Sequence, residues 1–146
     1  MKKHLFTTMA IAMFITAIAV TSAQAQNAPS VSVSIPFDFE VAGKTLKAGD
    51  YQVRMEGSRS TLKIENCDSL HTTFVTISPL QRRDIQDQSK LVFNRYGNQY
   101  FLSQVWIAGR SSGEEVRQDA TERGIRRELA ALGHKPERIE IAVRTN

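Results

Sequence analysis

The sequence has little of the residue types from which metal sites and nucleophilic active sites are built. Its 146 residues include one cysteine and three histidines. A single cysteine excludes a disulfide within the chain, so the fold must depend on its hydrophobic core. His71 and His134 are too far apart in sequence to give the close ligand pair typical of zinc sites. The pattern Gly-x-Ser-x-Gly occurs once, at 109–113, but in a segment that we expect to be a flexible link and not the sharp strand-to-helix turn that positions a nucleophile. No calcium-loop motif occurs. We therefore expect no metal, no cofactor and no enzymatic activity.

Long apolar runs are also absent, except for one near the N-terminus. It extends from Leu5 to Val20, after the basic Lys2-Lys3 pair and before Ala23-Gln24-Ala25. This order of basic, apolar and small residues is typical of a cleavable signal peptide. We expect a signal peptide over 1–25, with cleavage after Ala25, and export by the general secretory route to the periplasm or the exterior.

A retained membrane anchor is the alternative for this segment. The apolar run is shorter than the roughly 20 residues that span a bilayer. Polar residues follow it, and no basic cluster would stop its transfer. We therefore expect no transmembrane anchor in the mature chain, a flexible leader over 26–30 and one β-rich domain over 31–146.

The mature chain carries little net charge. Loss of Lys2 and Lys3 lowers the formal net charge from +4 to +2. A nearly neutral exported protein gives no reason to expect a nucleic-acid partner. Export favours a partner in the cell envelope.

Alternation of apolar and polar residues dominates the mature sequence and predicts strands with one buried face. Gly97-Asn98 predicts a hairpin turn. Residues 109–113 are expected to form a flexible link. Ile125, Leu129 and Leu132 then have helical spacing, with Asp119 or Thr121 as the N-cap and Gly133 as the stop. The expected fold is mainly β: a single antiparallel sandwich or small barrel of seven to eight short strands with one C-terminal α-helix.

Aromatic residues gather around the predicted hairpin. In the strand over 100–108, strict alternation places Phe101, Val105 and Ile107 on one face, and Tyr100, Leu102 and Trp106 on the other. Aromatic residues at such spacing are most often core, but they can also line a ligand cavity. The candidate lining consists of Phe93, Tyr100, Phe101 and Trp106.

Charged residues offer two weaker candidates. Asp38 and Glu40 lie two apart on a predicted strand, a spacing compatible with the carboxylate pair of a glycosidase but more typical of a solvated strand face. A cluster of basic residues could contact anionic polymers or lipid headgroups. Its interleaved acidic residues are more typical of a surface helix with i,i+4 ion pairs. The basic residues are Arg117, Arg123, Arg126 and Arg127, and the acidic ones are Glu114, Glu115, Asp119, Glu122 and Glu128.

Two sequence blocks carry a resemblance to a known family. Residues 35–53 begin with Ile-Pro-Phe-Asp-Phe and continue with Gly-Lys-Thr-Leu, and residues 90–106 contain Lys-Leu-Val-Phe, Arg-Tyr-Gly and Tyr-Phe-Leu-Ser-Gln. The chain resembles a family of short exported proteins of acidobacterial type, for which no activity is established. Its departures are Lys47, where the family usually has Pro, and Ala42, where it often has Gly. The resemblance implies export and a single β-rich domain, and it carries no catalytic residue over.

These observations favour a non-enzymatic secreted or periplasmic protein that serves as a structural or binding module. The alternative is a carrier that holds a small apolar ligand in a β-barrel cavity.

Overall fold

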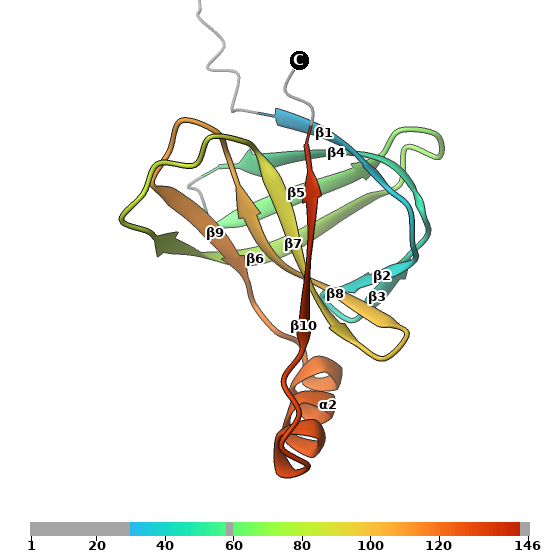
Figure 1. The fold of residues 1–146 in the computed structure, drawn as a ribbon. Coiled ribbons are helices and arrows are strands. Elements are labelled where there is room, and N and C mark those ends of the chain that lie inside the picture. The colour runs from blue at the N-terminus through green and yellow to red at the C-terminus, as the bar shows by residue number, and fades with distance from the viewer. Residues whose placement is uncertain (1–29, 58–59, 144–146) are drawn as a thin grey trace, which may run out of the picture.

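The computed structural model describes residues 30–57 and 60–143 and shows one curled, mostly antiparallel sheet with one helix near its C-terminus (Figure 1). The mainly β fold with a late helix is therefore confirmed. The expected signal peptide lies outside the described residues, as does the leader except Ser30, which begins the first strand. The elements are β1 (Ser30–Ile35), β2 (Phe39–Val41), β3 (Lys44–Leu46), β4 (Gly49–Glu56), β5 (Thr61–Asn66), β6 (Thr72–Gln81), β7 (Lys90–Tyr96), β8 (Gln99–Trp106), β9 (Ser112–Val116), α2 (Ala120–Ala131) and β10 (Glu137–Ala142).

The described strands number ten, more than the seven to eight expected. The strand predicted around Asp38 and Glu40 is present as β2, and the three-residue strand β3 is an additional one. A second additional strand, β9, forms where we expected a flexible link over 109–113. Alternation cannot be recognised over the three residues of β3, so sequence patterning misses such a strand.

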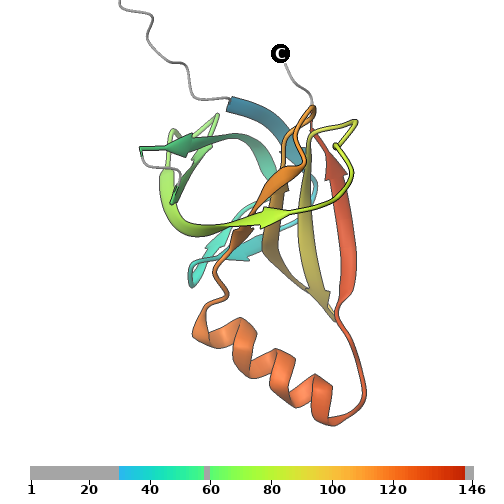
Figure 2. The ribbon, with the colours of Figure 1, turned by 90° about the vertical axis from the view of Figure 1, so that its left-hand side faces the viewer.

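The sheet follows the order β1-β4-β5-β6-β9-β8, and β7 and β10 continue it from the other edge of β8. The edge of β8 that pairs with β9 also pairs with β2, which runs parallel to β8 and contacts it at Glu40 and Phe101. The sheet curls until β1 contacts β10, and Figure 2 shows β4, β5 and β6 curving round to face the other strands. One continuous curled sheet is closer to the expected small barrel than to a sandwich of two sheets.

The core lies inside the curl and is built as the alternation predicts. Val31, Val33 and Ile35 of β1 are buried together with Tyr51 and Val53 of the paired strand β4. Burial of each such side chain stabilises the fold by about 1.5–3 kcal/mol.

Strand β8 departs from strict alternation because it contains a β-bulge. Val92 pairs with Gln104 and Phe93 with Leu102, which leaves Ser103 without an opposite residue. The extra residue reverses the faces after it. Leu102 and Val105 therefore both belong to the interior core, whereas the sequence prediction placed them on opposite faces.

Helix α2 begins and ends where its capping residues predict. Asp119 is the N-cap, and its side chain accepts a hydrogen bond from the N–H of Glu122. At the other end Gly133 has a φ of 75°, and the N–H of His134 donates to the carbonyl of Leu129. Figures 1 and 2 show α2 beneath one end of the curled sheet. No described helix has the length and apolar character needed to cross a bilayer.

Candidate functional site

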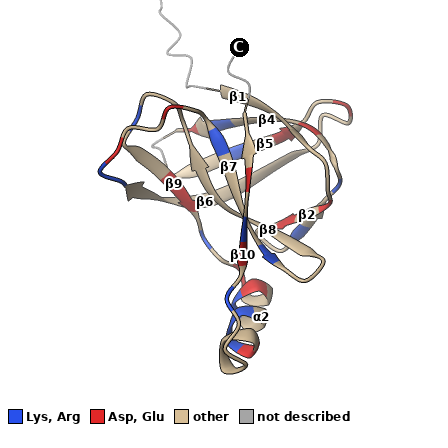
Figure 3. Ribbon diagram, in the orientation of Figure 1, with Lys and Arg blue, Asp and Glu red and all other residues tan. Residues whose placement is uncertain are grey.

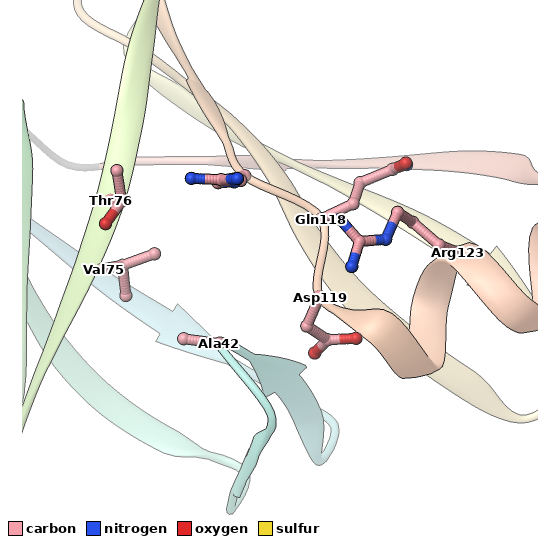
Figure 4. A pocket seen from close by; sticks show the side chains of 7 residues that line it. Ala42, Val75, Thr76, Gln118, Asp119 and Arg123 are labelled. Atoms are coloured by element: carbon pink, nitrogen blue, oxygen red, sulfur yellow. The ribbon is translucent and has the colours of Figure 1, made fainter.

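A pocket of about 330 Å³ opens where β9 leaves the sheet and the chain turns toward α2 (Figure 4). This volume is at the lower end of the range for ligand sites. The turn between β2 and β3 forms one side, β6 another, and the link between β9 and α2 the third. The lining residues are Ala42, Val75, Thr76, Arg117, Gln118, Asp119 and Arg123.

The pocket exists because β6 is longer than its partner β9. One edge of β6 pairs with β5 over Thr72–Thr76, and the other pairs with β9 only over Ile77–Gln81. The N–H of Arg117 makes the last contact along this edge, donating to the carbonyl of Thr76 at 3.1 Å. Beyond that point, no described strand pairs with this edge of β6, and the pocket lies beside it.

Asp119 fixes the wall opposite β6. Its Oδ1 accepts a hydrogen bond of 2.8 Å from the N–H of Glu122, and its Oδ2 accepts one of 2.8 Å from the N–H of Gly43. Both carboxylate oxygens are therefore bonded to backbone donors. The start of α2 is tied to the β2–β3 turn, which holds the pocket in shape.

Arg117 and Arg123 give the pocket its cationic character. Both are exposed, and neither guanidinium forms an ion pair or hydrogen bond with any residue that the structure describes. Figure 4 shows the Arg123 side chain extending from the first turn of α2. Two guanidinium groups outnumber the single lining carboxylate, that of Asp119, so the pocket favours an anion. Guanidinium groups bind carboxylate and phosphate through paired hydrogen bonds.

A buried polar cluster lies behind the pocket, between α2 and β7. Glu122 is only 3% exposed, and its Oε1 accepts hydrogen bonds from Asn94 (2.9 Å), Gln118 (3.2 Å) and the hydroxyl of Tyr96 (3.4 Å). The cluster attaches the first turn of α2 to the sheet. It also orients Gln118, which lines the pocket.

Burial shifts the pKa values of two groups in this cluster. It raises the pKa of Glu122 above its usual range, although the hydrogen bonds from Asn94, Gln118 and Tyr96 oppose the shift. Burial also raises the pKa of Tyr96 to about 12, with a further contribution from the Glu122 carboxylate. Tyr96 therefore stays protonated at neutral pH and donates its hydrogen bond.

The expected ion pairs along α2 do not form. Figure 3 shows Arg and Glu residues close together on α2, yet no described ion pair joins two residues of the helix. The interpretation of Glu122 as a solvated helix charge is wrong, because Glu122 is buried and accepts hydrogen bonds from Asn94 and Tyr96 of β7. Arg126 donates instead to Oε1 of Gln118 at 3.2 Å.

The four aromatic candidates do not surround one space. Phe93 belongs to the interior core, where Phe37 contacts it edge-on and also stacks on Tyr100, with ring centroids 5.2 and 4.0 Å apart. Phe101 faces the outside of β8 and contacts Tyr96.

Trp106 is also buried on the outer face of β8. Its ring crosses Gly113 of β9, where an added Cβ would lie 2.5 Å from the ring. The Arg82 guanidinium lies 5.1 Å from the ring centroid, and Nε1 donates to Gln104 at 3.0 Å. The Trp106 ring is therefore packed against β9, Arg82 and Gln104.

The remaining candidates are separate from one another. Asp38 accepts hydrogen bonds from Lys47 (2.7 Å) and from the N–H of Ala48 (2.9 Å), and these bonds lower its pKa. The Asp38 carboxylate therefore stabilises the turn between β3 and β4. The single cysteine, Cys67, is exposed. The described residues contain no cluster of three or more His, Cys, Asp or Glu suited to a metal ion.

Sequence reasoning identified the arginines of the pocket but not the pocket. Arg117 and Arg123 are six positions apart, and only the divergence of β9 from β6 brings them beside Thr76. The available signal for Glu122 is the Asp-x-x-Glu spacing from Asp119, which resembles a helix capping box. Comparison of the chain with protein-family models, curated proteins and solved structures gave no match.

Proposed function

We propose that this protein is a non-enzymatic binding module, exported from the cytoplasm, which holds an anionic group of its ligand in the pocket between β6 and α2. The observation that carries the proposal is the pair Arg117 and Arg123, whose guanidinium groups make no ion pair or hydrogen bond with a described residue. Thr76 and Gln118 add polar groups to the same pocket.

The packing of the aromatic residues supports this proposal over an apolar carrier. Phe93 and Phe101 are at most 1% exposed and face opposite sides of the sheet. A carrier needs an apolar cavity, whereas the pocket beside β6 is lined by two arginines, an aspartate, a threonine and a glutamine.

Thermal unfolding in the presence of succinate tests the binding proposal. A ligand that binds only the folded state raises the melting temperature. We expect succinate to stabilise the protein more than chloride does at equal ionic strength. The double variant Arg117→Gln/Arg123→Gln should lose this difference.

The matched control removes two charges elsewhere. Arg83 and Arg127 are exposed and do not line the pocket. The Arg83→Gln/Arg127→Gln variant should respond to succinate as the unchanged protein does. Equal loss of the response in both double variants would show an effect of overall charge and contradict a specific site.

Export is tested separately, by mass spectrometry of the protein recovered from cells. The proposal predicts an N-terminus at Gln26 in the periplasmic or extracellular fraction. A chain that still begins at Met1 in the membrane fraction would contradict cleavage.

A further inference from the structure

Beside the pocket, one edge of β6 presents backbone N–H and C=O groups that no described strand pairs with. In an antiparallel sheet, successive residues direct their N–H and C=O groups to opposite edges. The Thr76 carbonyl bonds to Arg117 on this edge, whereas the N–H of Ile77 donates to Ser60 on the β5 side. Phe74 has the same parity as Thr76, so its N–H and C=O face the edge along which no described strand pairs.

The composition of this edge would permit another strand to join it. Proteins protect exposed sheet edges with charges, prolines or bulges. The five residues 72–76 are Thr-Thr-Phe-Val-Thr, all strong strand formers without a charge. Phe74 is 58% exposed, an apolar surface for a neighbouring side chain. The edge strand β3, by contrast, carries Lys44.

The pocket adds charge at one end of this edge. The chain that follows β9 makes its last hydrogen bond to β6 between the Arg117 N–H and the Thr76 carbonyl, and both Arg117 and Arg123 line the pocket there. The Asp119 carboxylate is occupied by the N–H groups of Gly43 and Glu122. A strand lying along 72–76 would therefore meet two available guanidinium groups as it reached Thr76.

We propose that β6 binds an extended peptide segment of another protein as an added strand, with an acidic side chain of that segment bound by Arg117 and Arg123. Main-chain hydrogen bonds to Phe74 supply affinity, and the carboxylate supplies selectivity. The peptide continues the line of β9, antiparallel to β6, so its acidic residue lies at its N-terminal end. This inference rests on the anion-binding function proposed above and names its ligand.

The test uses a capped six-residue peptide, Glu-Val-Thr-Tyr-Thr-Val, and its counterpart with Gln in place of Glu. Binding is followed through the ¹⁵N amide shifts of the whole mature protein. We expect the amides of Phe74 and Thr76 to shift most, and the Glu peptide to bind about tenfold more tightly than the Gln peptide. The Arg117→Gln/Arg123→Gln variant should remove that tenfold difference.

Phe74→Pro removes the N–H that faces the peptide while leaving the β5 side of the ladder intact. Phe74→Ser is the matched control, because it loses the ring and keeps the N–H. We expect at least tenfold weaker binding for the proline variant and a smaller loss for the serine variant. Should the proline variant not fold, the amide shifts of the unchanged protein still decide the result.

Several results would overturn the inference. Equal binding of the two peptides would do so, and so would the absence of a shift at Phe74. A sedimentation-detected dimer that Phe74→Pro abolishes would make a second copy the occupant. Binding to phosphatidylglycerol vesicles that the Glu peptide does not displace would make a lipid surface the ligand. A protein stabilised by succinate that binds neither peptide would retain the proposed function and lose this inference.

Discussion

The carboxylate of Asp119 accepts a hydrogen bond of 2.8 Å from the backbone N–H of Gly43, a residue 76 positions earlier in the chain. The same carboxylate caps α2 through the N–H of Glu122. One side chain therefore joins a tight turn, a helix start and a pocket wall. Ligand binding and the stability of the α2 junction should depend on it together.

Replacement of Asp119 by alanine should destabilise the protein by about 1–2 kcal/mol, because a helix cap is lost and the Gly43 N–H loses its acceptor. Asp119→Asn keeps one acceptor oxygen and should cost less. Urea unfolding measures both. The control Asp87→Ala, at an exposed loop position, should stay within about 0.5 kcal/mol of the unchanged protein. If Asp119→Ala and Asp87→Ala changed the free energy of unfolding equally, the hydrogen bonds of Asp119 to Gly43 and Glu122 would contribute nothing to stability.

Ala42 has a φ of 51°, a left-handed conformation that glycine adopts without steric cost. Ala42→Gly should therefore stabilise the protein by about 1 kcal/mol. Ala48→Gly, at an exposed position without positive φ, should instead destabilise it slightly. Thermal unfolding distinguishes the two, and a destabilised Ala42→Gly variant would contradict the strained turn.

Glu122 should make stability depend on pH. Its pKa is higher in the folded than in the unfolded protein, so its stabilising contribution is complete below the unfolded pKa, near 4.5. That contribution is lost as the pH rises through the raised pKa. Glu122→Gln keeps an acceptor oxygen and does not ionise. We expect the melting temperature of the variant minus that of the unchanged protein to be larger at pH 7 than at pH 4. The same difference at both pH values would contradict the raised pKa of Glu122.

Trp106 and Gly113 give a packing prediction with an internal control. A Cβ at position 113 would lie 2.5 Å from the Trp106 ring, so Gly113→Ala should cost about 1–3 kcal/mol. A Cβ at Gly124, within α2, would meet nothing within 4 Å. Gly124→Ala should stabilise by up to about 1 kcal/mol. Chemical denaturation of the pair measures the difference, and equal effects would place the Trp106 ring elsewhere.

Alternation predicted most of the sheet because burial on one face imposes a period of two. The buried residues Val31, Val33 and Ile35 follow from it directly. Its failure within β8 comes from one extra residue, Ser103, because a bulge leaves no mark in composition. Strand β9 was missed because Ser112, Gly113 and the glutamates after them resemble a loop. Gly113 is there because the Trp106 ring needs its space.

The candidate site was less predictable than the fold. Asp119 as N-cap and Gly133 as stop followed from local capping rules. The pocket depends on non-local facts: β9 is shorter than β6, and the β2–β3 turn reaches Asp119. The burial of Glu122 has the same origin, because its partners Asn94 and Tyr96 lie on a strand distant in sequence.

The most direct measurement of the central claim is a titration of the ¹⁵N-labelled mature protein with succinate, observed at its backbone amides. Binding in the pocket predicts saturable shifts concentrated at Thr76, Arg117, Gln118 and Arg123, and their loss in the Arg117→Gln/Arg123→Gln variant. Small shifts that grow without saturation and spread over basic residues around the sheet would contradict it.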